Sequence, residues 1–164
     1  MFKELVSDSR CREKMFGMVK MMGDDLKYFA GDIESVFMDY VVKNSGNATI
    51  AIDSLCQDLA KNYGIFQKLF ALNTDISKRE KILEHISFTQ EFLKLEEVVK
   101  SLRGLNYSDS DIVELIEGCI DMNRGAGVFA QILITARTIR TLGIQADKET
   151  INRLMYESYY TEMN

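Results

Sequence analysis

The only histidine of the chain, His85, is the residue best suited to acid–base chemistry, and Arg79 precedes it by six positions. A histidine titrates near neutral pH, so its imidazole can both accept and donate a proton there. A guanidinium can stabilise negative charge that develops on a phosphate in a transition state. The two residue types could therefore support phosphodiester cleavage. Six residues along a helix, however, place the two side chains about 240° apart.

This arginine-to-histidine spacing resembles that of a class of helical ribonucleases that use both residues on one helix. The resemblance implies that His85 would act as general acid and base and that Arg79 would stabilise a phosphorane-like charge. A helical ribonuclease is the third of three functional hypotheses. The structural alternative is a partly exposed histidine near a helix end.

The segment 55–72 resembles a DNA-binding helix-turn-helix. Ala60 would let two helices approach closely, and Gly64 would take the left-handed conformation of the turn. A second helix would then face the major groove. The candidate nucleic-acid contacts are Lys61, Gln67 and Lys68. The net charge of −5 opposes this hypothesis, because phosphate contacts normally dominate affinity for DNA. A DNA-binding regulator is therefore the alternative function, and an ordinary helix corner is its structural counterpart.

Patterns for metals, cofactors and covalent catalysis are incomplete. One histidine and three widely spaced cysteines, Cys11, Cys56 and Cys119, do not provide the usual zinc spacings. The segment 121–127 begins like a calcium loop but lacks its glycine at the sixth position and its closing glutamate. We expect no catalytic residues, no metal and no cofactor. The cysteines are expected to be reduced thiols in a cytoplasmic protein.

Methionine and aromatic residues suggest contact surfaces instead. The chain has nine methionines, and several of them cluster between residues 15 and 22. Methionine suits an adaptable core or a plastic binding groove, and tyrosine is enriched at interfaces. The candidate contact residues are Met15, Met18, Met22, Phe29, Tyr156, Tyr159 and Tyr160. We therefore expect a small non-enzymatic helical protein that acts through protein–protein contacts, as an adaptor, regulator or assembly factor, with self-association as one form of contact.

These residues must be positioned by helices, because the chain has no proline and its apolar residues recur at helix spacing. The strongest repeat is an apolar seam made of Met15, Val19, Met22, Leu26, Phe29, Ile33, Phe37 and Tyr40. The pattern predicts an all-α fold, a compact bundle or array of about seven or eight helices joined by short turns. The expected helices are 2–22 and 24–43, which break at Gly23 or fuse into one bent helix, followed by 48–63, 65–72, 77–86, 89–103, one that carries residues 112–120, 128–142 and one that carries residues 151–159. Ser77 with Glu80 forms a capping-box pattern, a residue from Ser108 to Ser110 caps the helix over 112–120, and Asp147 caps the last helix.

The organisation expected is one helical domain over residues 1–164, with 44–47 as the best candidate for an internal boundary. No apolar run approaches the 18 or so residues that a membrane span needs, so no membrane contact is expected. Residues 102–107 and 139–144 form a weak internal echo about 37 residues apart, a spacing within the range of helical repeats. Two hairpins of shared design would give the same echo.

Overall fold

The computed structural model describes residues 9–29, 33–71, 76–86, 89–123 and 127–163. Within these ranges the backbone forms helices and turns and no strand, which confirms the predicted all-α class. None of the described helices combines the length and apolar character that crossing a lipid bilayer requires. The elements are α2 (Ser9–Met22), the 3-10 helix η1 (Gly23–Tyr28), α3 (Ile33–Lys43), α4 (Ala48–Phe70), α5 (Ile76–Ile86), α6 (Thr89–Phe92), α7 (Leu95–Arg103), α8 (Asp109–Asn123), α9 (Val128–Thr141) and α10 (Lys148–Met163).

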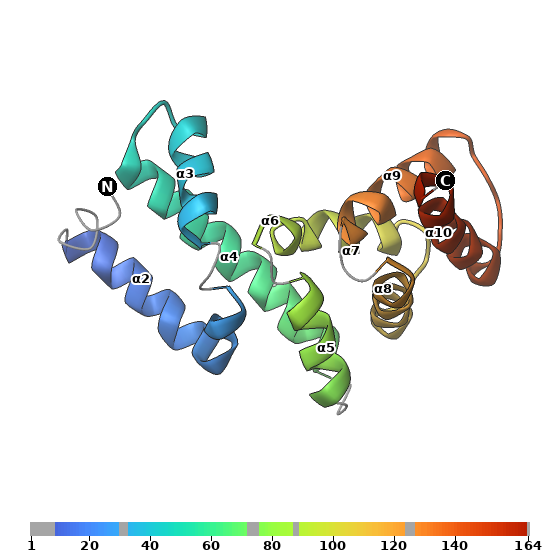
Figure 1. Ribbon diagram of the computed structural model, residues 1–164, viewed down its shortest axis with the longest axis horizontal. Coiled ribbons are helices and arrows are strands. Elements are labelled where there is room, and N and C mark those ends of the chain that lie inside the picture. The colour runs from blue at the N-terminus through green and yellow to red at the C-terminus, as the bar shows by residue number, and fades with distance from the viewer. Residues whose placement is uncertain (1–8, 30–32, 72–75, 87–88, 124–126, 164) are drawn as a thin grey trace.

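The long helix α4 organises the N-terminal half of an elongated molecule (Figure 1). Helices α2 and α3 both pack against it, and α4 also contacts α7 and α8. Residues 44–47 form a tight turn between α3 and α4, in which Ser45 is left-handed at φ 56°. The helices on the two sides of this turn therefore pack closely on one another.

In the C-terminal half, α9 and α10 form a packed hairpin, and α7 and α8 lie beside it. Helix α7 packs against α9, and α8 packs against α10. Both α7 and α9 end in the same way. The N–H of Tyr107 donates to the carbonyl of Leu102 at 3.0 Å, and the N–H of Ile144 donates to that of Ile139 at 3.1 Å. Both are Schellman caps, and this shared capping motif explains the similarity between residues 102–107 and residues 139–144 in the sequence.

Helix α4 runs without interruption through Gly64, so the predicted turn at this residue is wrong. Glycine costs about 1 kcal/mol in a helix interior relative to alanine. Burial outweighs that cost, because Tyr63, Phe66 and Leu69 continue the buried face past the glycine at 3 %, 1 % and 4 % exposure. Over its described residues, 55–71, this segment therefore contains no helix-turn-helix corner.

The inward face of α2 is only partly the predicted apolar seam: Met22 is buried and Met15 packs against the core, but Val19 is exposed and Met18 is buried instead. Met18 is 5 % exposed, whereas Val19 is 43 % exposed. The buried side of α2 carries Cys11, Met18 and Met22, spaced seven and four residues apart. Both faces contain apolar residues, and packing against α4 selects one of them. The expected break at Gly23 is confirmed, since this residue adopts φ 54° and η1 begins there.

Two helix starts are capped by a side chain that is close in the sequence. The predicted caps at Ser108 and Asp147 are confirmed: the Ser108 hydroxyl accepts the Asp111 N–H at 3.1 Å, and the Asp147 carboxylate accepts the Thr150 N–H at 2.8 Å. The predicted capping box at Ser77 is not formed as expected, because α5 already begins at Ile76. The single helix predicted over 89–103 is divided into α6 and α7 by two turn residues, 93 and 94.

Two helices that lack a side-chain cap of their own are capped from a distance. The residues that precede α7 and α9, Lys94 and Gly127, make no side-chain cap. Instead, the Asn62 side chain of α4 accepts the Glu96 N–H of α7 at 2.9 Å. The Glu91 carboxylate of α6 accepts the Phe129 N–H of α9, also at 2.9 Å. These bonds satisfy amides at the helix starts and fix the orientation of successive helices.

Candidate contact groove between α2 and α4

Several of the residues predicted to form a contact surface belong to the core of this chain. Met18, Met22 and Phe29 are at most 5 % exposed, and the Phe29 ring meets the Phe92 ring edge-on at a centroid distance of 4.7 Å. Met15 is only partly buried, and its side chain packs against this core. Met22 and Phe29 cannot form an open surface, because their area is already taken up within the chain, whereas Met18, although 5 % exposed, also lines the pocket described below.

Of the three C-terminal tyrosines predicted to form a contact surface, the structure describes the side chain of Tyr156. Tyr156 is half-buried and lies across Gly118 of α8, where an added Cβ would be 2.5 Å from the tyrosine hydroxyl oxygen. The glycine thus allows α10 to pack on α8 through this ring. The side chains of Tyr159 and Tyr160 lie outside the described residues.

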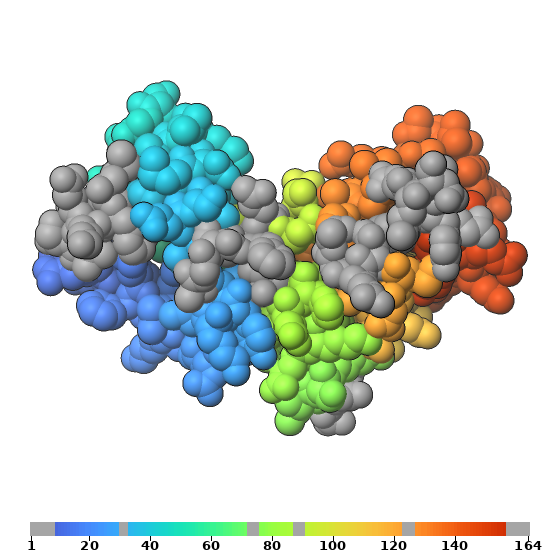
Figure 2. Space-filling view, in the orientation of Figure 1, coloured from blue at the N-terminus to red at the C-terminus, as the bar shows by residue number. Residues whose placement is uncertain are grey.

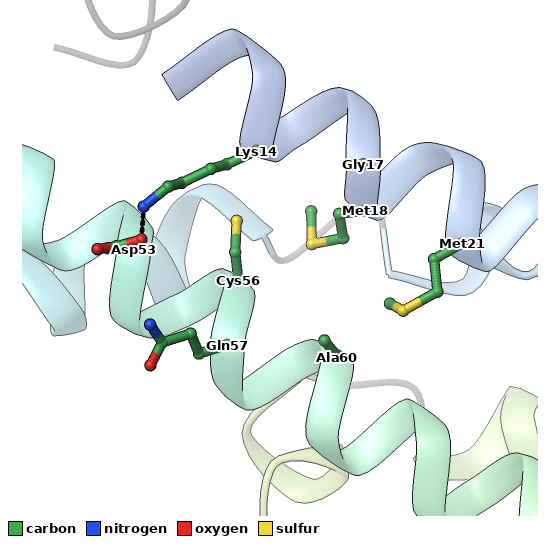
Figure 3. A pocket seen from close by; sticks show the side chains of 8 residues that line it. All are labelled: Lys14, Gly17, Met18, Met21, Asp53, Cys56, Gln57 and Ala60. Carbon is green, nitrogen blue, oxygen red and sulfur yellow. Dashed lines mark ion pairs between the residues drawn. The ribbon is translucent and has the colours of Figure 1, made fainter. Parts of the chain in front are cut away.

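An apolar pocket opens between α2 and α4 (Figure 3). Its volume is about 410 Å³. An ion pair between Lys14 and Asp53 marks one end, and Met21 lies beside Ala60 at the other end. Because residue numbers rise in the same direction on both walls, the two helices run parallel. The pocket is lined by Lys14, Gly17, Met18, Met21, Asp53, Cys56, Gln57 and Ala60.

Small residues keep the pocket open. Gly17 on α2 and Ala60 on α4 both line the pocket at positions where larger side chains would fill part of it, and no atom lies within 4 Å of an ideal Cβ at Gly17. The remaining walls include Met18, Met21 and Cys56, which present flexible or soft apolar atoms. Such a wall can adapt to an inserted side chain. We call the pocket together with the exposed side of α2 the α2–α4 groove.

The thiol of Cys56 forms part of the wall of this groove. Burial raises the pKa of the thiol, and the nearby Lys14 ammonium only partly opposes this effect. The thiol is therefore neutral at pH 7, whereas the thiolate is the reactive form. The Lys14 charge is itself engaged by Asp53.

The outer side of α2 is unusually basic and partly apolar. The helix carries four basic side chains, Arg10, Arg12, Lys14 and Lys20, and a single acidic one, Glu13, in a chain whose net charge is −5. Phe16 is 68 % exposed and Met21 is 37 % exposed. Lys20 follows Phe16 by four residues and Gly17 by three, so its position joins the outer face to the mouth of the pocket.

Figure 2 shows a notch in the surface between α3 and α9. A second pocket lies between α3 and the junction of α6 and α7, and its volume is about 520 Å³. Its charged lining residues are Asp39, Lys43, Lys94 and Glu97, two of each sign. This balance favours no particular charge on a partner, in contrast to the α2 surface.

Arg79 forms part of a structural cluster. Its Nη2 lies 2.5 Å from Oδ2 of Asp25, and its guanidinium carbon lies 5.2 Å from the centre of the Phe66 ring. The Tyr63 hydroxyl donates to the same carboxylate at 2.5 Å. The Arg79 hydrogen bond lowers the pKa of Asp25 more than burial raises it. The cluster ties η1 and α5 to α4. His85 is partly buried further along α5, and its six-residue spacing puts it on a different face from Arg79.

The residues proposed to contact DNA lie on a continuous helix. Lys61 is paired with Glu96 of α7, with 3.1 Å between Nζ and Oε1, and Gln67 and Lys68 are exposed on α4. Without a turn at Gly64 there is no separate recognition helix to present them. In the part of the chain that the structure describes, no group of three or more His, Cys, Asp and Glu side chains could hold a metal ion.

Residues that matter in the structure were missed for identifiable reasons. The groove depends on Gly17 and Ala60, whose small size becomes informative only when α2 is known to lie along α4. The remote cap Asn62 is 3 % exposed, and a buried asparagine within an apolar helix face was a sequence signal for an internal hydrogen bond.

Comparison of the chain with protein-family models, with curated proteins and with solved structures gave no match.

Proposed function

We propose that this chain acts through protein–protein contact and that the α2–α4 groove is its contact surface. The observation that carries this proposal is the open apolar pocket held between two parallel helices by Gly17 and Ala60. Protein contacts draw their energy from a few anchors that enter well-packed pockets. A pocket of about 410 Å³ with methionine walls suits one or two apolar side chains of a partner.

The surface beside the pocket supports the same function. Phe16 and Met21 leave aromatic and thioether surface exposed on α2, and aromatic residues, methionine and arginine are enriched at interfaces. The Arg79 cluster is engaged in holding helices together, and the Cys56 thiol is neutral. Protein binding is therefore the function that this surface supports best. An adaptor, a regulator or an assembly factor would use it in the same way.

Site-specific photo-crosslinking in an extract of the source cells tests this function. A benzoylphenylalanine at position 57, on the pocket rim, should give discrete adducts with another protein. The same group at position 134 is the control, because Ile134 is 57 % exposed on α9, which does not line the groove. Adducts from position 57 should disappear when Gly17→Trp fills the pocket. Equal adducts from both positions, or none from position 57, would refute the proposal.

A further inference from the structure

We infer that the outer face of the α9–α10 hairpin is an interface between two copies of this chain. We call this surface the terminal face, and it consists of Ile134, Thr138, Leu142, Ile144 and Leu154. All five side chains are exposed, and the exposed fractions of the four apolar ones run from 37 % at Leu154 to 67 % at Leu142. Helices α9 and α10 lie at one end of the elongated molecule, away from the α2–α4 groove (Figure 1). The inference therefore concerns a second, separate surface.

The side of α7 that α9 covers identifies the matching side of α9. Glu97 of α7 is paired with Arg137 of α9, and an ideal Cβ at Gly104 would lie 3.8 Å from Nη1 of Arg140. Positions 97 and 104 are seven residues apart and therefore mark one side of α7. The Schellman caps of α7 and α9 are 37 positions apart, so the same side of α9 carries positions 134 and 141. Ile134, the equivalent of Glu97, is 57 % exposed on that side.

The residues that follow the two helices show the same difference between a covered and an open side. Leu105 is half-buried against the core, whereas its equivalent Leu142 is 67 % exposed. Tyr107 is 4 % exposed, and its hydroxyl donates to Oδ1 of Asn152 of α10 at 2.5 Å. Its equivalent Ile144 is 40 % exposed. Apolar side chains thus recur at positions that are covered after α7 and open after α9.

Helices α8 and α10 repeat this difference. Leu115 of α8 lies between Asp111, which pairs with Lys148 of α10 at 2.6 Å, and Gly118, which contacts the α10 tyrosine described above. Leu115 is therefore on the side of α8 that α10 covers, and it is fully buried. Leu154 is likewise the seventh residue after the N-cap of its helix, but it is 37 % exposed. A further helical layer stacked on α9 and α10 would bury these side chains, as successive layers do in helical stacks.

The absence of charge on the terminal face favours a second copy as this layer. In a two-fold contact each residue near the axis meets its own counterpart, so a charged side chain there would oppose a like charge. None of the five residues of the terminal face is ionisable. Arg137 is paired with Glu97 on the α7 side, and the Asp147 carboxylate accepts the Thr150 N–H at the start of α10. A second copy brings the same apolar side chains, so both surfaces are buried without a charge conflict.

Sedimentation equilibrium of the full chain over a concentration series tests the inference. The parent chain should approach twice its monomer mass as the concentration rises. Leu142→Glu and Leu154→Glu place like charges in the contact, and each should raise the dimer dissociation constant by about tenfold or more. Val42→Glu is the matched control and should leave this constant unchanged, because Val42 is 77 % exposed on α3. Far-UV circular dichroism should show unchanged helicity, since all three substituted side chains are exposed.

A benzoylphenylalanine at position 134 of the purified chain gives an independent readout. Illumination should produce an adduct of twice the chain mass, and Leu142→Glu should abolish it. This adduct contains only copies of this chain, so its mass and peptide content distinguish it from the adducts with another protein that are expected from position 57.

Three results would overturn the inference. One is a monomer mass at every concentration, which is expected if a different protein covers the terminal face. Another is a dimer that both glutamate variants leave intact, which would place the interface elsewhere. The third is a mass that keeps growing beyond the dimer, because head-to-tail stacking does not close as a two-fold contact does. Each of these results leaves the α2–α4 groove to its own test from position 57.

Discussion

Replacing Gly64 with alanine should stabilise the protein, and the sign of this effect depends on whether α4 is continuous. Gly64 lies inside α4, and no atom lies within 4 Å of an ideal Cβ at this position. Alanine is therefore accommodated without displacing a neighbour. It also removes backbone freedom from the unfolded chain, and alanine in a helix interior is better than glycine by about 0.5–1 kcal/mol. In a chain of this length that gain corresponds to a rise in Tm of about 1–4 °C.

Gly143→Ala is the matched control. Gly143 also has nothing within 4 Å of an ideal Cβ, but its φ is +61°. An alanine there must adopt the left-handed conformation, which costs roughly 1–2 kcal/mol. The two variants share the same chemical change and the same open surroundings. They differ in backbone conformation, so the free energies of unfolding should move in opposite directions and separate by about 2 kcal/mol.

Urea unfolding followed by far-UV circular dichroism measures both variants against the parent chain. An unchanged m-value would show that the change lies in stability and not in the compactness of either state. If Gly64→Ala lowered the unfolding free energy by 1 kcal/mol or more, a turn with positive φ at this residue would explain it. That result would refute the continuous helix and restore the helix-turn-helix corner.

Three further predictions concern contacts between helices. Gly118→Ala places a Cβ 2.5 Å from the Tyr156 hydroxyl oxygen, so overpacking of about 1–3 kcal/mol should exceed the helix gain of about 1 kcal/mol; a higher Tm would contradict this packing. Asn62→Ala leaves the partly buried Glu96 amide of α7 without this partner and should cost about 1 kcal/mol in urea unfolding; a neutral result would show that the remote cap is not needed. The pKa of Asp25 is lowered in the folded state, so its stabilising contribution is complete above its unfolded pKa and is lost as the pH falls through the folded pKa. The stability gap between the parent and Asp25→Asn should therefore shrink between about pH 5 and pH 2, and a gap that grew on acidification would contradict the pairing with Arg79.

The helices themselves were largely predictable because their signals are local. The caps at Ser108 and Asp147 use side chains three residues away along the chain, and the break at Gly23 needs only a residue that accepts positive φ. The shared ends of α7 and α9 were visible as an echo for the same reason. Where a local signal competed with packing, as at Gly64, the prediction failed.

The candidate site was harder to predict, since it depends on which helices become neighbours. Met18 and Val19 are adjacent and both apolar, and the contact with α4 buries the first and leaves the second 43 % exposed. Gly17 and Ala60 are 43 positions apart, and nothing local to either residue pairs them.

The sequence by itself determined the all-α class, most helix positions and the local caps, because hydrophobic periodicity and capping act over three to seven residues. Tertiary structure decided that α4 continues through Gly64, that Asn62 and Glu91 cap helices far away in the chain, and that α2 and α4 enclose a pocket. These features arise from burial and from hydrogen bonds between distant segments. Their free energies become available only when the helices pack, and at Gly64 that energy outweighs the local preference of the residue.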